Sequence, residues 1–360
     1  MNDIYDILVI GAGPAGATFA RRAATDGKRI LLVDGQSPTA PKPCGGLLSP
    51  DAQRVLARFD FVLPRSVLAD PQIFSVKTMD LASQRVRYYQ RYYLNMNRYA
   101  FDKWLLSLVP PSVDCILGRC LEVRRQDGVF CADILVGGKL QTFRGRLLVG
   151  ADGANSVVRK RFFNRPIMKY VSIQQWFPRG TESNPFYSCV FDPETSESCS
   201  WMMYKDDAVI FGGCFTPKGC RLAFEQQKKR LSAFLGQDLG EPFRTEACLA
   251  DRPRRMRDFV MGKDGVYLIG EAAGFISASS FEGISSAIIS GDALAAAMKS
   301  GGTHNQITRA YRRGTAKLHF KLWLKIKKRW FMYTPIIRRL IMASGLASID
   351  VEDRRDNEKQ

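Results

Sequence analysis

Three glycines near the start of the chain have the spacing of a phosphate-binding turn. The segment GAGPAG places Gly11, Gly13 and Gly16 in the pattern G-x-G-x-x-G. Gly11 permits a tight turn, Gly13 lets the backbone approach a pyrophosphate, and Gly16 lets a helix pack closely on a strand. Asp34 follows about 20 residues later, where a carboxylate can accept hydrogen bonds from the hydroxyls of an adenosine ribose. These residues predict a dinucleotide site.

Two later segments place an acid beside glycines after an apolar run. VGADGANSVVRK carries Asp152 and Gly153, and LIGEAAGF carries Glu271. Each segment follows a strand-like run and opens a helix-like one. An extended FAD needs contacts at its adenine, pyrophosphate, ribityl chain and ring, and several separated segments can supply them. We therefore expect FAD rather than NAD as the cofactor.

The apolar runs that hold these residues define the fold class. Residues 6–10 and 29–34 predict buried strands on either side of a helix that reaches Ala24. Residues 119–149 predict a meander of strands, and residues 265–270 predict another buried strand. We expect an α/β protein with a Rossmann-type FAD-binding domain assembled from separated segments, a β-sheet substrate domain and a C-terminal helical segment.

The predicted domains follow the changes in strand character along the chain. The FAD-binding domain is expected to comprise residues 1–70, 95–165 and 251–300. The substrate domain, with shorter runs rich in β-forming residues, is expected to comprise residues 71–94 and 166–250. A basic amphipathic helical segment is expected at residues 301–345.

With these motifs the chain resembles the FAD-dependent family of geranylgeranyl reductases, within the larger hydroxylase-like flavoprotein superfamily. Inside that family it is similar, over nearly its whole length, to one group of bacterial flavoproteins. The segments that carry this similarity are PKPCGGLLSPDAQ, DPQIFSVKT, YVSIQQWF, PFYSCVFD and LIGEAAGFISASSFEGIS.

The resemblance implies a set of residues that bind the cofactor. FAD contacts are implied for Ala15, Asp34, Cys44, Gly45, Arg98, Cys120, Leu121, Glu271, Gly283 and Ile284. Asp152 and Gly153 match the superfamily's D-G motif near the pyrophosphate. Glu271 is expected to reach the ribityl hydroxyls, and Gly283 and Ile284 to present N–H groups to the pyrimidine edge of the ring. Since the family's usual acid at the position of Glu271 is Asp, its loop is expected to lie slightly further back.

The resemblance also implies an oxidoreductase that reduces an apolar, isoprenoid or lipid-like substrate by hydride transfer from reduced flavin. The family's substrate-domain pattern is Y-x-W-x-F-P followed by G-x-G. In CSWMMYKDDAVIFGGC, Trp201 is kept, but Cys199, Met203 and Tyr204 stand in place of the Tyr, Phe and Pro. The identity of the lipid therefore does not carry over. Trp201 is either a substrate contact or a buried core residue.

Cys44 begins the segment CGG, which we expect to form an exposed bend that lets the backbone press against a flat group. In the family this cysteine lies beside the flavin. Its thiol would serve there either as a proton donor or as a packing group, and both interpretations remain open.

Two other functions remain open. Flavin monooxygenases that hydroxylate small or aromatic substrates share the fold and both motifs, but they commonly have a His after Gly-Asp-Ala-Ala and a Pro soon after it. Here Gly274 and Phe275 follow, and Ala278 occupies the proline position. A flavin-bearing membrane-surface protein without turnover is the other alternative. The electron donor, NAD(P)H or a ferredoxin-like protein, is also left open.

The positive charge of the chain is concentrated near its C-terminus. The net charge is +18, and no Asp or Glu lies between Asp292 and Asp350. Helical spacing in TAKLHFKLWLKIKKRWFMY puts one set of lysines on one face, namely Lys317, Lys321, Lys325 and Lys328. The apolar residues beside them are Leu318, Leu322, Ile326 and Trp330, widened by Phe320, Trp323, Leu324 and Phe331. This helix predicts binding to an anionic membrane surface rather than to nucleic acid, with packing on the protein as the alternative.

The remaining composition predicts the cellular setting. Nine cysteines without a CxxC pair, and an N-terminus without a signal pattern, predict a cytoplasmic protein, peripheral at the inner membrane face if the basic helix binds there. No uncharged apolar stretch approaches the roughly 20 residues of a spanning helix. With only His304 and His319 and no cluster of ligands, no metal site is expected.

Overall fold

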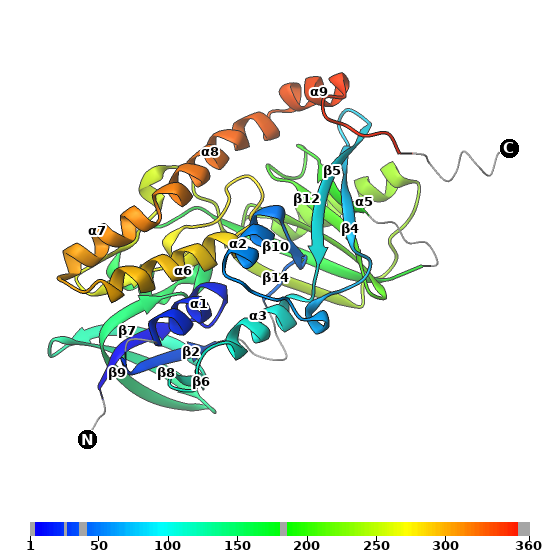
Figure 1. The fold of residues 1–360 in the computed structure, drawn as a ribbon. Coiled ribbons are helices and arrows are strands. Elements are labelled where there is room, and N and C mark those ends of the chain that lie inside the picture. The colour runs from blue at the N-terminus through cyan, green and yellow to red at the C-terminus, as the bar shows by residue number, and fades with distance from the viewer. Residues whose placement is uncertain (1–3, 25–26, 36–41, 181–185, 352–360) are drawn as a thin grey trace.

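Two β-sheets with helices packed against them make up the fold (Figure 1). The structure is a computed structural model that describes residues 4–24, 27–35, 42–180 and 186–351. The strands of the first sheet lie within 4–34, 114–150 and 262–268, and those of the second within 47–48, 73–95 and 169–251. The predicted α/β fold class is confirmed, whereas the division into domains stays a prediction.

The first sheet has the strand order of a dinucleotide-binding fold. Its parallel strands are, in spatial order, β6 (Asp114–Leu117), β2 (Ile30–Asp34), β1 (Ile4–Ile10), β9 (Lys139–Gly150) and β16 (Val266–Leu268). Counted along the chain this order is 3-2-1-4-5, so the direction of progression reverses between β1 and β9. Short β15 (Gly262–Lys263) pairs antiparallel with β16 at the edge.

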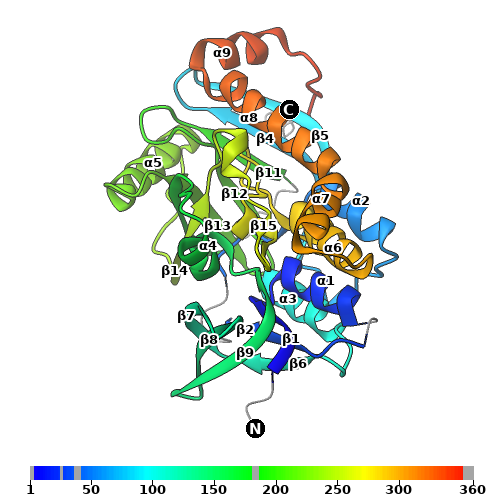
Figure 2. The same ribbon diagram turned by 90° about the vertical axis from the view of Figure 1, so that its left-hand side faces the viewer.

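Helices cover one side of this sheet and a meander lies on the other (Figure 2). The helices are α1 (Pro14–Ala23), α3 (Arg98–Ser107) and α6 (Ile284–Lys299). The meander is β7 (Arg119–Gln126), β8 (Val129–Val136) and the first half of β9, as expected for residues 119–149. A Cβ atom on Gly291 of α6 would lie 2.5 Å from the Ala15 carbonyl oxygen, so this glycine lets α1 and α6 touch.

The second sheet is antiparallel apart from one pair of strands. Its order is β14 (Arg244–Asp251), β10 (Lys169–Pro178), β13 (Ala208–Phe215), β12 (Ser200–Lys205), β11 (Phe186–Phe191), β4 (Ile73–Asp80), β5 (Arg85–Asn95) and β3 (Leu47–Leu48), with β11 and β4 parallel. Helix α5 (Cys220–Leu235) covers one face, where Phe224 stacks on Phe211 and meets Phe215 edge-on. The opposite face carries Trp201 and Met203 in a separate apolar cluster.

Smaller elements complete the connections. The remaining short helices are α2 (Pro50–Arg58), α4 (Val157–Phe162) and single 3-10 turns at Arg65–Val67, Gly153–Asn155, Met256–Asp258 and Gly270–Ala273. Ser49 precedes α2 as its N-cap residue and Pro50 opens it, as the sequence predicted.

The C-terminal helices α7 (His304–Gly314), α8 (Ala316–Tyr333) and α9 (Pro335–Ser344) run along the outer edge of the molecule, away from the N-terminus (Figure 1). Leu318 and Leu322 of α8 are buried in the core. None of the helices in the described part of the chain combines the length and the apolar composition that a bilayer span requires.

Two of the four lysines that share one face of α8 form ion pairs with the protein. Lys321 Nζ lies 2.7 Å from Asp51 of α2, and Lys325 Nζ lies 3.6 Å from the same carboxylate and 3.4 Å from Glu282. These two lysines pair with acids of the protein because Leu318 and Leu322 turn that side of the helix toward it.

A buried ion pair ties α9 to the second sheet. Arg338 Nε lies 2.9 Å from Asp80 Oδ2, and both side chains are less than a tenth exposed. The Arg338 guanidinium also lies 4.7 Å from the centre of the Phe191 ring. Helix α9 is therefore held by one charge pair whose partners lie far apart in the sequence.

We expect Asp80→Ala to lower the free energy of unfolding by about 3 to 5 kcal/mol, because Arg338 is left buried without its counter-charge. The double variant Asp80→Ala/Arg338→Met should recover part of this loss. Urea unfolding of the three proteins measures the effect. Equal midpoints for Asp80→Ala and the unaltered protein would show that α9 does not depend on this pair.

Candidate functional site

The glycine turn after β1 makes two close backbone contacts and leaves one open position. A Cβ atom on Gly16 would lie 1.8 Å from the Gly11 carbonyl oxygen, and one on Gly11, whose φ is 106°, would lie 2.4 Å from the Ala151 carbonyl oxygen. A Cβ atom on Gly13 would meet no described atom within 4 Å. Gly11 and Gly16 are thus required by packing, whereas Gly13 faces space that a ligand can fill.

This turn lies at the point where the strand order reverses. Ala151, just after β9, donates its N–H to the Ile10 carbonyl over 2.7 Å, so the ends of β1 and β9 are held together. A Cβ atom on Gly270, just after β16, would lie 2.9 Å from the Ala15 Cβ atom. In open α/β sheets ligands bind in the crevice at such a reversal, beyond the carboxyl ends of the strands.

Asp34 at the end of β2 is buried and paired. Its Oδ2 atom lies 2.7 Å from Lys103 Nζ on α3. This ion pair joins the end of β2 to α3. The contact of Asp34 with a ribose stays a prediction. The sequence did not indicate Lys103 as its partner.

Asp152 offers a buried acceptor. Its Oδ2 atom accepts the N–H of Val157 over 2.7 Å and so caps the start of α4. Its Oδ1 atom is buried and has no hydrogen-bond partner within the described residues. Burial raises the pKa of Asp152, although its hydrogen bonds act in the opposite direction. A buried carboxylate oxygen without a partner is costly, so a ligand hydroxyl or N–H at this position would be stabilised.

Leu121 lies in a β-bulge. Cys120 pairs with Ile134 and Glu122 pairs with Asp133, so Leu121 is the extra residue and its side chain is exposed. A bulge takes backbone N–H and C=O groups out of the ladder and leaves them available to a ligand. Burial raises the pKa of the neighbouring Cys120 thiol to about 12, so this cysteine is neutral at ordinary pH.

Glu271 begins the turn after β16 and has two partners within the protein. Its Oε2 atom lies 2.8 Å from Lys42 Nζ, and its Oε1 atom accepts the Asp251 N–H over 3.0 Å. Burial acts to raise the pKa of Glu271, but Lys42, the Asp251 N–H and Lys169 outweigh it, so the pKa is lowered. The carboxylate is therefore ionised in the site, and its contact with a ribityl chain stays a prediction.

The CGG segment is not the exposed bend that the sequence suggested, because β12 of the second sheet packs over it. A Cβ atom on Gly45 would lie 2.7 Å from Met203 Cε and 3.5 Å from Trp201 Nε1. A Cβ atom on Gly46 would lie 2.6 Å from Lys205 Nζ. The two glycines allow the segment to lie directly under the side chains of one strand.

Buried cations surround Cys44. Arg98, one of them, pairs with Asp102 over 2.9 Å, and Cys44 is among the groups that raise its pKa. Burial alone would lower the pKa of the Arg98 guanidinium. Asp102 and Cys44 more than offset this effect, so the pKa is raised. Burial lowers the pKa of Lys205 to about 8, against the influence of Cys44 and Asp206. Two cationic side chains, Arg98 and Lys205, thus lie near the Cys44 thiol.

The start of α6 contributes free N–H groups. Gly283 is the N-cap residue and Ile284 the first helical residue, so their N–H groups have no acceptor within the helix. Glu282 just before them lies 3.4 Å from the Tyr93 hydroxyl of β5. The first turn of α6 also meets the β16 turn, since a Cβ atom on Gly270 would lie 3.7 Å from Ala287.

Trp201 lies on the face of the second sheet opposite α5, beside the CGG segment. It pairs across strands with Gly212, and a Cβ atom there would lie 2.6 Å from the indole ring, so the glycine makes room for the ring. Its Nε1 atom is buried and has no acceptor in the part of the chain that the structure describes. Around it lie apolar residues that include Ile73, Tyr93, Met203 and Ile210.

Four site residues were not predicted, namely Lys42, Lys103, Lys205 and Asp251. Strand periodicity could have revealed Lys205, because Trp201, Met203 and Lys205 alternate and so share a face. For Lys42, Lys103 and Asp251 no spacing signal exists, because each meets its partner only through the tertiary fold.

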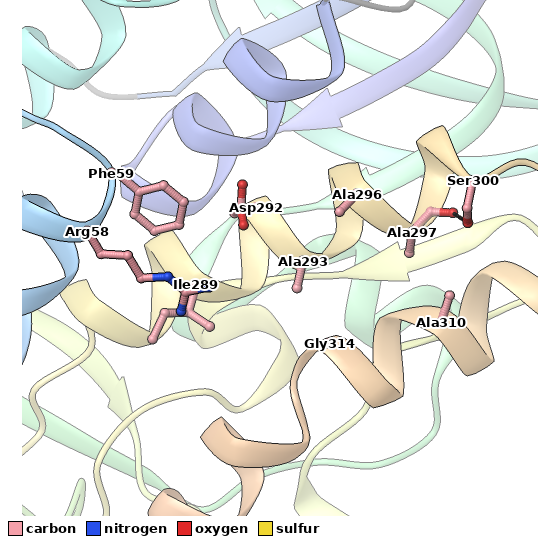
Figure 3. A pocket seen from close by; sticks show the side chains of 10 residues that line it. All are labelled: Arg58, Phe59, Ile289, Asp292, Ala293, Ala296, Ala297, Ser300, Ala310 and Gly314. Atoms are coloured by element: carbon pink, nitrogen blue, oxygen red, sulfur yellow. Dashed lines mark hydrogen bonds between the residues drawn. The ribbon is translucent and has the colours of Figure 1, made fainter.

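A cavity of about 320 Å³ lies elsewhere, between α2, α6 and α7 (Figure 3). It is lined by Arg58, Phe59 and Asp292 together with alanines of α6, and by none of the predicted site residues. Its position behind the helices makes it a packing gap rather than the reaction site. No group of His, Cys, Asp and Glu side chains within the described residues can hold a metal ion.

Two solved structures share the fold of this chain. A geranylgeranyl bacteriochlorophyll reductase-like protein from Thermoplasma acidophilum superposes with a TM-score of 0.76 at 20% identity, over 91% of this chain and 88% of that one. PqsL of Pseudomonas aeruginosa, a probable FAD-dependent monooxygenase, gives a TM-score of 0.70 at 17% identity, over 96% of this chain and 100% of that one. At these identities the comparison establishes the fold alone.

The chain belongs to the CbrA family. It is 44% identical over 352 residues to protein CbrA of Escherichia coli strain K12, which covers 96% of this chain and 98% of that protein. Protein CbrA of Escherichia coli O9:H4 strain HS is 45% identical over the same length. No family model matches the chain. The resemblance expected from the sequence is thereby confirmed.

Asp251 predicts a pH-dependent stability. Burial raises its pKa from 3.8 to about 7, although Lys169 lies beside it and acts in the opposite direction. Because the folded protein holds the proton more tightly than the unfolded chain, this group stabilises the fold below about pH 4, and that contribution is lost as pH rises through about 7.

We expect Asp251→Asn to remove this dependence, a difference on the order of a few kcal/mol between pH 4 and 8. Urea unfolding of both proteins across that range measures it. Parallel stability curves for the two proteins would contradict the raised pKa. Glu225→Gln on α5 is the matched control and should follow the unaltered protein.

Proposed function

We propose that the chain binds FAD without a covalent bond and is an FAD-dependent oxidoreductase. The observation that carries the proposal is the meeting of the GAGPAG, VGADG and IGEAAG segments where the strand order reverses. Gly13 is open there, and the Oδ1 atom of Asp152 lacks a partner among the described residues. These residues fit a cofactor that carries a pyrophosphate and several hydroxyls.

Each part of the cofactor would meet a different segment. The N–H groups at the start of α1, including that of Ala15, would bind the pyrophosphate, and Asp34 would bind the adenosine ribose. The bulge at Leu121 would offer backbone groups to the adenine. Glu271 would accept from the ribityl hydroxyls, and the N–H groups of Gly283 and Ile284 would stabilise negative charge at the ring.

We further propose an apolar, isoprenoid or lipid-like substrate that is reduced in the site. FAD, when bound, supplies the hydride chemistry. The chain supplies the apolar face of the second sheet, where Trp201 and Met203 would pack on the substrate and exclude water. The Trp201 N–H, which has no acceptor among the described residues, can donate to a polar group of the substrate.

Cys44 is the proposed proton donor. Arg98 and Lys205 lie beside it and stabilise the thiolate that remains after the proton leaves. Lys205 also ties the bend to the end of β5, because its ammonium donates to the Gly46 carbonyl over 3.2 Å and to Asn95 Oδ1 and the Met96 carbonyl, each over 2.6 Å. Arg98 and Lys205 are thus positioning residues for the thiol.

A flavin monooxygenase is the second candidate. It is favoured by the likeness to PqsL, whose TM-score of 0.70 is close to the 0.76 of the reductase-like protein. The two candidates differ in the atom added to the substrate. A reductase adds hydrogen without dioxygen, whereas a monooxygenase adds oxygen and needs it.

Titration of the protein with FAD tests the cofactor proposal, and titration of Glu271 variants tests the contact of this residue with FAD. We expect the unaltered protein to bind FAD and Glu271→Ala to bind it about tenfold to a hundredfold more weakly, since buried hydrogen bonds worth about 1 to 3 kcal/mol are lost. Glu271→Gln should lose less, and Glu271→Asp should be nearly neutral if the loop can close.

Lys42→Ala separates the direct contact from the ion pair, because it removes the partner of Glu271 but leaves the carboxylate. Weaker FAD binding in Glu271→Ala than in Lys42→Ala supports a direct contact, and equal loss in both would assign the effect to the ion pair. An unaltered protein that releases and takes up no FAD would refute the cofactor proposal.

Anaerobic mixing of chemically reduced protein with polyprenyl lipids tests the reaction. We expect reoxidation of the flavin together with a product that is two hydrogens heavier by mass. Cys44→Ala should slow this step by about tenfold to a thousandfold if the thiol donates the proton, whereas Cys115→Ala, at an exposed thiol on β6, should not.

The same experiment in air distinguishes the alternatives. A product with inserted oxygen, formed only with dioxygen, would replace the reductase by the monooxygenase. Reoxidation no faster than by dioxygen alone, with every lipid tried, would favour a flavin-bearing protein without turnover. An unchanged rate in Cys44→Ala would assign the proton to water.

A further inference from the structure

The outer side of α8 and α9 exposes an unusual concentration of large apolar side chains. Of the 21 such side chains exposed in the described residues, nine lie between 320 and 346. They are Phe320, Trp323, Leu324, Trp330, Phe331, Ile336, Leu340, Ile341 and Leu346. Such an apolar surface marks an interaction site.

On α8 these residues form a face opposite the one that packs on the protein. Leu318 and Leu322 point inward and are buried, and Lys325 on the same side pairs with Asp51 and Glu282. Phe320 and Phe331, 61% and 52% exposed, lie on the opposite side of the helix. Both faces of the helix are therefore apolar, but only one of them is covered by the described chain.

The charge around the exposed face is entirely positive. Lys317 and Lys327 of α8 and Arg339 of α9 are exposed there. No Asp or Glu occurs between Asp292 and Asp350. Trp323 and Trp330 are partly to well exposed, and tryptophans are favoured at the boundary between water and lipid.

We propose that the exposed side of α8 and α9 docks on an anionic lipid bilayer and lies in its surface without crossing it. The apolar side chains would enter the boundary between headgroups and acyl chains, and the cations would meet the lipid phosphates. A second copy of the chain is disfavoured as the occupant, since it would bring the same unbalanced cations together.

The docking helix also contacts the loop that leads into the candidate site. The Tyr333 hydroxyl donates to the Ser279 carbonyl over 2.5 Å, and Lys325 lies 3.4 Å from Glu282. Gly283 and α6 follow directly. A bilayer bound to α8 would thus contact the same helix that holds this loop. Such an arrangement would let the site take its substrate from the lipid.

Cosedimentation with vesicles of phosphatidylcholine, alone or mixed with phosphatidylglycerol, tests the proposal. We expect binding to the mixed vesicles at least about tenfold tighter than to the neutral ones, weakened by salt. Phe320→Ala/Phe331→Ala/Leu340→Ala should weaken it by about tenfold or more. Lys317→Gln/Lys327→Gln/Arg339→Gln should abolish the preference for the mixed vesicles.

Leu222→Ala/Phe243→Ala is the matched control, because these apolar side chains are as exposed but lie on α5 and before β14. It should bind vesicles like the unaltered protein, and thermal unfolding should show all variants folded. Equal binding by the apolar variant and the unaltered protein would overturn the proposal. The proposal would also be overturned if the unaltered protein formed a dimer without lipid and the apolar variant were a monomer. A second copy of the chain would then be what covers this surface.

Discussion

The close approach of the first glycine turn to the end of β9 is the contact on which the site depends. The Gly11 backbone leaves no room for a side chain beside Ala151, and Gly16 leaves none beside Gly11. These contacts bring the ends of β1 and β9 and the start of α1 into one place, and Gly270 adds the end of β16 by meeting Ala15. Any side chain at these glycines would push the elements apart, and the acids that follow each strand would no longer face the same space.

Buried charges around that space are balanced by lysines from other parts of the chain. Asp34 meets Lys103 of α3, Glu271 meets Lys42, and Asp251 meets Lys169 of β10. Each pair joins segments far apart in the sequence, and breaking one would leave a buried charge without compensation. The pairs therefore fix separate segments of the chain to one another and give each acid a charged partner.

Strand β12 of the second sheet contributes side chains to both faces of the sheet. Strand periodicity sends Met202 of β12 toward α5, where it joins Phe211 and Phe224, and sends Trp201 and Met203 toward the CGG segment. Helix α8 is divided in the same way, with Leu318 and Leu322 in the core and Phe320 and Phe331 outside. In both elements the spacing of side chains along the sequence thus divides them between two opposite faces.

The sequence by itself determined the local features of this protein. The spacing of Gly11, Gly13 and Gly16, the acid at Asp34 and the apolar runs around them predicted the Rossmann-type half, because turn geometry and strand burial depend on neighbouring residues. The basic, apolar character of residues 316–344 was likewise visible. Only the tertiary structure decided that Lys42 pairs with Glu271, that Cys44 is covered by β12, and that Lys321 and Lys325 face Asp51. The physical reason is that such pairings are set by how sheets and helices pack across long separations in the chain, and no periodicity within one segment encodes its partner in another.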